Sequence, residues 1–289
     1  MKKIKSGIYG LNPLMDGGVN KNSTTVVVGA SGAGKTTFAT QFIRRGLEEG
    51  QEGIFVSLDE NKQQIIREAV EMGWAEILDY LDDEKLVFID ASGKDFSKFI
   101  KKELPSFVDQ WIGADARIVV DPLTPVMWAI DSRYEQRDLI GFLLKETRKV
   151  GTVVCTLEEH GSTADLSGNE IVIPMYLADS VIHLQYSLSG GDFNRNLRII
   201  KCRSSRHSQE SHPYRIIRGL GLIVEGKNRS KKVTREIPNK LENILNTKRI
   251  PTPIKKQFQK VLKDLRDEDF KGLPLEDLID DIIDEYEGK

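Results

Sequence analysis

The chain has 289 residues, of which 39% are hydrophobic and 30% charged, and its formal net charge is −2. This length suits one large domain with an appendage, or two small domains. No apolar run approaches the roughly 18 residues of a membrane-spanning helix, and no apolar stretch follows the basic N-terminus as in a secretory signal. The two cysteines, Cys155 and Cys202, fall in strand-like segments. We therefore expect a cytoplasmic protein without a disulfide framework.

Short apolar runs bounded by turn residues recur through the first 226 residues. In chain order, the expected strands are TTVVVGA, GIFVSL, KLVFIDA, RIVVD, TVVCTL, SVIHLQY, LRIIKCR and YRIIRG. Several are continuously apolar, which is typical of strands covered on both faces. Helical periodicity separates the early strands, over residues 36–49, 61–72 and 134–149. The alternation predicts an α/β fold with a mainly parallel central sheet flanked by helices. The last strands follow each other closely and predict antiparallel hairpins at one edge.

The composition changes after Gly226. Residues 227–266 carry 13 Lys/Arg against 3 Asp/Glu, whereas residues 267–289 carry 2 against 10. We therefore expect a first domain over residues 1–226 and a small, charged helical extension over residues 227–289.

The extension contains two apolar stripes at helical spacing. The first comprises Ile254, Phe258, Val261, Leu262 and Leu265, and the second Leu275, Leu278, Ile279, Ile282, Ile283 and Tyr286. One helix is basic and the other acidic, so an antiparallel hairpin would join their stripes and their opposite charges. We expect it to cap the protein's own core. A docking module for a partner protein stays open, as does a basic arm for nucleic acid. The scarcity of aromatic residues among the basic ones argues against stacking on single strands.

Residues 26–39, VVVGASGAGKTTFA, place a glycine-rich loop between a strand and a helix. The spacing fits the phosphate-binding pattern G-x4-G-K-[ST]. Glycines allow positive φ, so backbone amides turn inward around a phosphate, and the following helix presents its free N–H groups to the same anion. A plain flexible connector is the alternative, but such a pattern arises by chance in about one chain per hundred of this length.

The loop thus predicts a site for ATP and Mg²⁺. Lys35 would contact the β- and γ-phosphates, and the Thr36 hydroxyl would ligate Mg²⁺. The expected nucleotide-binding residues are Ser31, Gly32, Ala33, Gly34, Lys35, Thr36 and Thr37.

Carboxylates end two of the expected strands. Asp121 ends RIVVD, where it can hold the Mg²⁺ shell beside a phosphate-binding loop. Asp59 and Glu60 end GIFVSLDE, and one of them could polarise the water that attacks the γ-phosphate. The residues alone leave open a second interpretation, in which Asp59 or Asn61 simply caps the helix that follows.

Together these segments resemble the KaiC-like branch of the RecA-superfamily ATPases. GIYGLNPLMDGG looks like that family's leader, GASGAGKTT its phosphate-binding loop, GIFVSLDE its strand with paired acids and RIVVDPLTPV its Walker B strand. LADSVIHLQY and KCRSSRHSQESHPYRI resemble a late strand and a K-x-R…H segment of the family. The likeness runs in order from about residue 6 to 225. The loop by itself would be unspecific, but the ordered set is specific.

The resemblance implies a RecA-like core that binds ATP between adjacent subunits, commonly in six-membered rings. The family's paired acids include the carboxylate that activates water, so Glu60 and Asp59 become catalytic candidates. Lys201 and Arg203 fall where the family extends basic residues toward the neighbour's γ-phosphate, and His207 occupies the family's histidine position. Residues two apart on a strand share a face, so Lys201 and Arg203 would point together. A solvated edge strand is the plainer alternative for them.

Three positions depart from the family pattern. Asn12 stands where the leader often has Asp, and Glu159 stands where a basic residue is common. Asp59 stands where the first acid is usually Glu, which shortens the reach to the water by one methylene. This third departure affects the expected hydrolysis rate more than nucleotide binding.

Other features separate the chain from two relatives of the branch. We find one phosphate-binding loop and no internal repeat, so a role like that of the two-lobed clock proteins does not follow. The core starts within about ten residues of Met1, so we expect no N-terminal DNA-binding domain of the recombinase type.

The leading hypothesis is a Mg²⁺-dependent, oligomeric ATPase that acts as a regulatory switch or assembly ATPase. The alternatives are an ATP-binding signalling scaffold with little hydrolysis, and a RecA/RadA-like DNA-binding ATPase.

Overall fold

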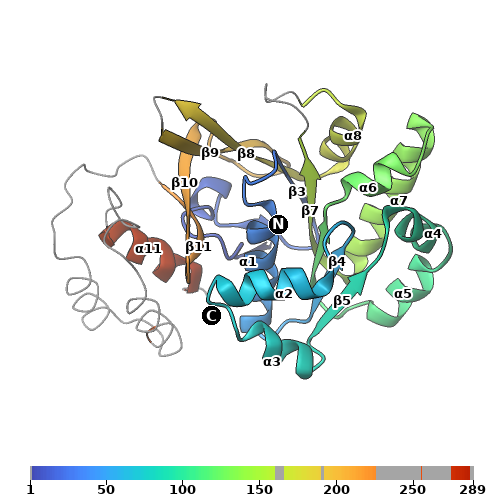
Figure 1. The fold of residues 1–289 in the computed structure, drawn as a ribbon, viewed down its shortest axis with the longest axis horizontal. Helices are drawn as coiled ribbons and strands as arrows, with labels where there is room; N and C mark the ends of the chain where they lie inside the picture. The colour runs from blue at the N-terminus through green and yellow to red at the C-terminus, as the bar shows by residue number, and fades with distance from the viewer. Residues whose placement is uncertain (1, 160–165, 190–191, 226–254, 256–274, 287–289) are drawn as a thin grey trace.

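The structure is a computed structural model, and it describes residues 2–159, 166–189, 192–225, 255 and 275–286. In this part of the chain, nine strands form one central sheet in the order β11-β10-β9-β8-β3-β7-β6-β4-β5 (Figure 1). Their bounds are β3 Thr24–Gly29, β4 Gly53–Ser57, β5 Leu86–Asp90, β6 Ala116–Asp121, β7 Gly151–Glu158, β8 Ser180–Ser189, β9 Asp192–Cys202, β10 Ser211–Ile217 and β11 Gly221–Val224.

The sheet has a parallel part and an antiparallel part. The strands from β8 to β5 in the sheet order pair in parallel. β9, β10 and β11 follow as antiparallel neighbours at the other edge. The expected mainly parallel sheet with late hairpins is therefore confirmed. The sequence pattern missed β11, a four-residue strand, and the small ribbon of β1 Lys3–Ile4 with β2 Val19–Asn20.

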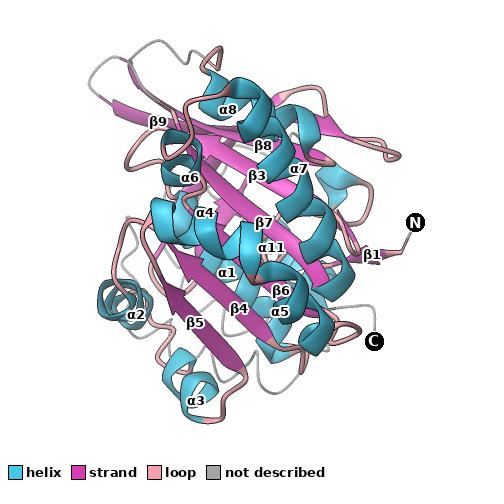
Figure 2. Ribbon diagram, turned by 90° about the vertical axis from the view of Figure 1, so that its right-hand side faces the viewer, coloured by secondary structure: helices cyan, strands magenta, loops and turns pink. Residues whose placement is uncertain are grey.

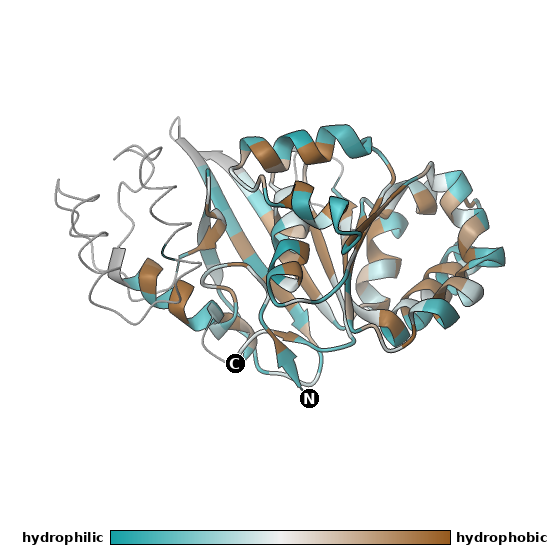
Figure 3. Cartoon of the chain, turned by 90° about the horizontal axis from the view of Figure 1, so that it is seen from below, coloured by the Kyte–Doolittle hydropathy of each residue, from teal (hydrophilic) through white to brown (hydrophobic). Residues whose placement is uncertain are grey.

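Helices cover both faces of the sheet (Figure 2). Their bounds are α1 Lys35–Glu48, α2 Lys62–Glu71, α3 Ile77–Asp82, α4 Gly93–Lys102, α5 Leu104–Trp111, α6 Thr124–Trp128, α7 Arg133–Val150, α8 Asn169–Leu177 and α11 Leu275–Tyr286, with a short 3-10 turn, η1, at Pro13–Met15. The three helices expected from periodicity correspond to α1, α2 and α7. Apolar and polar residues alternate along the helices that cover the sheet (Figure 3). Among the described ranges, no helix is long and apolar enough to cross a membrane.

The central strand β3 is buried on both faces, as its continuous apolar run predicts. Val26 and Val28 pack into the core on the side of α4 to α8. Val27 packs into a second core with residues of α1 and of the N-terminal leader. Both layers thus hold β3 in place, and the loop that follows it starts from a fixed point.

The acidic stripe of the C-terminal extension forms α11, whose Leu278, Ile279 and Ile282 are buried. The basic stripe over residues 254–265 lies, apart from position 255, outside the described residues, so the proposed hairpin stays a prediction. The division of the chain at Gly226 also stays a prediction, because α11 packs back onto the first domain.

Candidate nucleotide-binding site

The glycine-rich loop connects β3 to α1, as its position in the sequence predicts. Gly32 and Gly34 have φ values of +78° and +92°, which favour glycine. A Cβ at Gly34 would lie 2.5 Å from the Ile216 side chain on β10. From behind, the Tyr214 hydroxyl donates a hydrogen bond to the Ala33 carbonyl oxygen at 2.6 Å. Backbone conformation and packing therefore both fix the curve of the loop.

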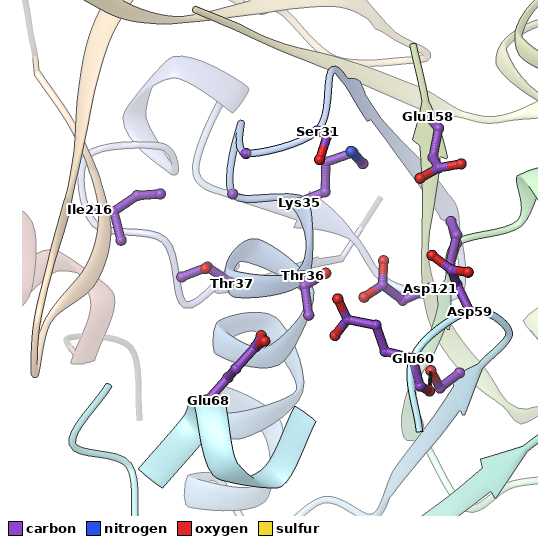
Figure 4. A pocket seen from close by; sticks show the side chains of 14 residues that line it. Ser31, Lys35, Thr36, Thr37, Asp59, Glu60, Glu68, Asp121, Glu158 and Ile216 are labelled. Carbon is purple, nitrogen blue, oxygen red and sulfur yellow. Dashed lines mark hydrogen bonds between the residues drawn. The ribbon is translucent and has the colours of Figure 1, made fainter. Parts of the chain in front are cut away.

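A cavity of about 350 Å³ opens in front of the loop (Figure 4). It is lined by Ser31, Gly32, Gly34, Lys35, Thr36, Thr37, Ser57, Asp59, Glu60, Glu68, Asp121, Pro122, Glu158 and Ile216. Of the seven loop residues expected to bind nucleotide, six line the cavity. Ala33, the seventh, is buried behind the loop.

Lys35, the first residue of α1, lines the cavity. Its ammonium group donates to the Ala30 carbonyl oxygen at 3.0 Å, so it is held over the loop itself. Burial lowers the pKa of Lys35, and the nearby carboxylates of Glu158, Asp121 and Glu159 oppose that shift. A partly buried cation beside a glycine-rich loop suits a polyphosphate ligand.

Asp121 ends β6 beside the start of α1. It is 5% exposed, and it accepts hydrogen bonds from the hydroxyls of Thr156 and Thr36. Burial raises the pKa of Asp121, while the two hydroxyls and the Lys35 charge act against that rise. A carboxylate and a hydroxyl side by side form an oxygen donor set that suits Mg²⁺, so the residues present fit the expected metal.

The paired acids follow β4 at the same edge of the sheet. Ser57 is in register with Asp121, and the Leu58 N–H donates to the Asp121 carbonyl oxygen at 3.0 Å. Both acids line the cavity. The Glu60 carboxylate points toward Thr36 and Asp121 (Figure 4). Burial, followed by the charge of Glu68, raises the pKa of Glu60.

The catalytic and the helix-capping interpretations of this segment apply to different residues. Asn61 caps α2, since its side chain accepts from the Gln64 N–H at 2.9 Å. The capping interaction therefore involves Asn61, which leaves the side chains of both acids in the cavity.

Lys201 and Arg203 do not line this cavity. Both donate to the Tyr176 carbonyl oxygen at the C-terminal end of α8, at 2.9 Å and 3.0 Å, so they do point together. Burial and the neighbouring Arg203 charge lower the pKa of Lys201. Within one chain they lie outside the cavity in front of the glycine-rich loop. His207, close by in sequence, contacts Gln209.

Five lining residues were not among the expected site residues: Ser57, Glu68, Pro122, Glu158 and Ile216. A signal existed for Glu158, because it ends an apolar strand that is parallel to β3 and so reaches the same edge. Ile216 and Glu68 carry no local signal. They reach the cavity only through the pairing of β10 and the packing of α2.

Comparison with known proteins assigns the chain to a known protein family. A sequence model of the KaiC ATPase family matches residues 4–229. The chain belongs to the KaiC family of ATPases. The expected resemblance and the RecA-like core are thereby confirmed.

Several relatives of this KaiC-family chain can be aligned with it. The circadian clock oscillator protein KaiC of Thermosynechococcus vestitus is 31% identical over 79% of this chain but over only 45% of its own length. The chain thus spans less than half of such clock proteins. A UPF0273 protein of Methanopyrus kandleri is 26% identical, over 75% of this chain and 89% of its own length. The crystal structure of a KaiC-like protein from Pyrococcus horikoshii superposes with a TM-score of 0.64 at 29% identity, covering 78% of this chain and 99% of that one.

Proposed function

We propose that this KaiC-family chain hydrolyses ATP in a Mg²⁺-dependent reaction at the cavity in front of the glycine-rich loop. The observation that carries the proposal is the cavity itself, which unites the loop, the Thr36–Asp121 pair and the Glu60 carboxylate. Nucleotide binding needs the first of these features, metal binding the second and hydrolysis the third.

Each part of the site has a proposed role. The loop amides and Lys35 bind the phosphates, and Thr36 and Asp121 hold Mg²⁺, which when bound neutralises charge on the β- and γ-phosphates. Glu60 orients and deprotonates the attacking water, because its carboxylate points toward the metal-binding pair. Asp59 is the second candidate for this role, in line with the family's usual preference for the first acid.

The proposal extends to an oligomer, with a six-membered ring as the form that the family resemblance favours. Lys201 and Arg203 do not line the cavity of their own chain, so we assign their role at the γ-phosphate to the cavity of a neighbouring subunit. A ring of this kind would serve as a regulatory switch or assembly ATPase.

Three measurements on the full chain test this function. Phosphate release from ATP is followed with Mg²⁺ and with EDTA, ATP affinity is measured by calorimetry, and the mass in solution is measured with and without ATP. We expect Mg²⁺-dependent release and an oligomer with ATP. Tight ATP binding without release would instead favour an ATP-binding scaffold, and no binding at all would exclude both functions.

A further inference from the structure

Two ionisable side chains that the proposed mechanism does not use are buried against each other next to the loop. Glu159 directly follows β7, and His183 lies within β8. The His183 Nε2 atom is 2.9 Å from the Glu159 Oε2 atom, and the side chains are 3% and 5% exposed. A buried carboxylate is costly in free energy without a hydrogen-bonding partner, and His183 supplies that partner for Glu159. Glu159 is also one of the positions at which the chain departs from the family pattern.

The pair crosses the strand that carries the loop. β3 lies between β7 and β8 and pairs with both, with His183 in register with Val28. Adjacent strands are about 4.8 Å apart, so a contact from β7 to β8 passes across the end of β3. The Glu159 N–H also donates to the Gly29 carbonyl oxygen at 3.1 Å. The pair therefore lies directly at the residue from which the loop leaves the sheet.

Charged groups surround this pair. The Glu159 carboxylate is close enough to Lys35 to act on the pKa of its ammonium group. Glu158 faces the cavity from the end of β7, and Arg198 on β9 is in register with His183. A nucleotide at the loop, even with its Mg²⁺, adds net negative charge on the side of the loop where Glu159 lies. Its repulsion is weakest when a proton on His183 balances the Glu159 charge.

We propose that nucleotide binding at the loop is coupled to the uptake of a proton by His183, which the buried Glu159 carboxylate retains. The inference rests on the proposed function, because it requires a nucleotide at this loop. Linkage is reciprocal, so nucleotide favours the protonated pair and the protonated pair favours nucleotide. Affinity should therefore fall as the pH rises. Uptake of one full proton would weaken binding by about tenfold per pH unit, and partial uptake by less.

Calorimetry of the full chain tests this coupling. Mg²⁺ and a non-hydrolysable ATP analogue are titrated in buffers of different ionisation enthalpy between pH 6 and 8, which gives the number of protons taken up. We expect a smaller number in His183→Gln, whose amide can donate a hydrogen bond but cannot titrate, and in Glu159→Gln. His212→Gln is the matched control. It alters a buried histidine on β10 that contacts Ser208, and it should keep the wild-type number.

Equal proton uptake in the wild type and in His183→Gln would overturn the inference while leaving the proposed function intact. A wild type that binds no nucleotide would overturn both. If the variants fail to fold, the ring resonances of the four histidines in the wild type decide. At constant pH near 7, we expect nucleotide to shift the ring resonances of one histidine toward the chemical shift of its protonated form. If no histidine resonance shifts in this way, the inference is overturned.

Discussion

Lys35 contributes the cationic side chain that lines the cavity, so its removal should mainly lower the affinity for nucleotide. Its ammonium group already contacts the loop at Ala30 and needs little movement to reach a phosphate. Hydrogen bonds to charged groups contribute about 1.5–3 kcal/mol each, so Lys35→Ala should weaken ATP binding by about 10- to 150-fold. Calorimetry measures the change. Lys94→Ala, at an exposed position on α4, is the control. Unchanged ATP affinity in Lys35→Ala would contradict the assignment of ATP to this site.

Glu60 and Asp59 can be separated by isosteric substitution. Glu60 points toward Thr36 and Asp121, so Glu60→Gln should reduce turnover by about 10²- to 10⁴-fold, as the loss of a general base does. ATP should still bind, and Asp59→Asn should be milder. Steady-state phosphate release compares the two, with Glu71→Gln on the outer part of α2 as control. The reverse order would make Asp59 the water-activating acid, and full turnover in both would leave neither with a catalytic role.

The protonation of Glu60 should appear in the pH dependence of turnover. Burial raises the pKa of this carboxyl above its ordinary value of 4.5, and a base works only when deprotonated. Turnover should therefore rise with pH through a midpoint above 4.5, and this acid limb should be absent from the residual activity of Glu60→Gln. If the limb persists in that variant, Asp121, whose pKa is also raised by burial, becomes the group that titrates.

The predictability of single residues depends on where their partners lie. The loop from Ser31 to Thr37 can be recognised because its pattern is contiguous in the sequence, and six of its seven residues line the cavity. The departures at Asn12 and Glu159 could be noticed in the sequence but not explained. Asn12 donates a hydrogen bond to the Glu285 carboxylate, which an aspartate could not do, and Glu159 pairs with His183. These partners are 273 and 24 residues away.

At the scale of elements, α11 is attached by an unusual buried carboxylate. Glu285 is 1% exposed. It accepts hydrogen bonds from the Gly7 N–H at 2.7 Å and from the Arg45 side chain at 3.2 Å. The Arg45 guanidinium also stacks over the Tyr286 ring, 4.0 Å from its centroid. The end of α11 thus joins the leader to the last turn of α1, the helix that begins at the glycine-rich loop.

This attachment should weaken as the pH rises. Burial raises the pKa of Glu285 from 4.5 to about 7, although the Arg45 charge acts in the opposite direction. A carboxyl with a raised pKa stabilises the folded arrangement while it is protonated, and this contribution is lost as the pH rises through about 7. Amide hydrogen exchange, corrected for intrinsic rates, should show less protection of α11 at pH 8 than at pH 6. Glu285→Gln should remove the difference, with α7 as an internal reference. Equal protection of α11 at both values in the wild type would contradict this account.

Two of the elements that the sequence pattern missed have physical reasons for being missed. α8 carries apolar residues around its whole circumference and contains Pro174, so it lacks the one-sided periodicity of a surface helix. β11 has four residues and is too short for a pattern. The eight longer strands were predictable, but their order in the sheet was not, because it depends on crossovers between distant segments.

At the scale of the whole molecule, Lys201 and Arg203 are the expected site residues that do not line the cavity of their own chain. In the single chain, both side chains bind carbonyl oxygens at the end of α8, and the Lys201 ammonium lies 6.0 Å from the centroid of the Tyr176 ring. They lie at the C-terminal end of β9 and outside the lining of the cavity, which is what a contribution to a neighbouring subunit would require. Such a cation stabilises charge that develops in the transition state, so its loss should affect turnover more than binding.

Mixed assemblies test whether the active site is shared. Arg203→Ala should lower turnover by about 10³-fold with little change in ATP affinity. Glu60→Gln should have little turnover because it lacks the carboxylate that deprotonates the attacking water. When the two variants are mixed with ATP, some interfaces combine an intact Glu60 side with an intact Arg203 side. Phosphate release should then partly return, because one wild-type cavity per such interface is restored. A mixture that stays inactive although the subunits exchange would place both residues at one subunit's site. A chain that remains monomeric with ATP and keeps full turnover as Arg203→Ala would exclude the ring, while the binding role of the glycine-rich loop would stand.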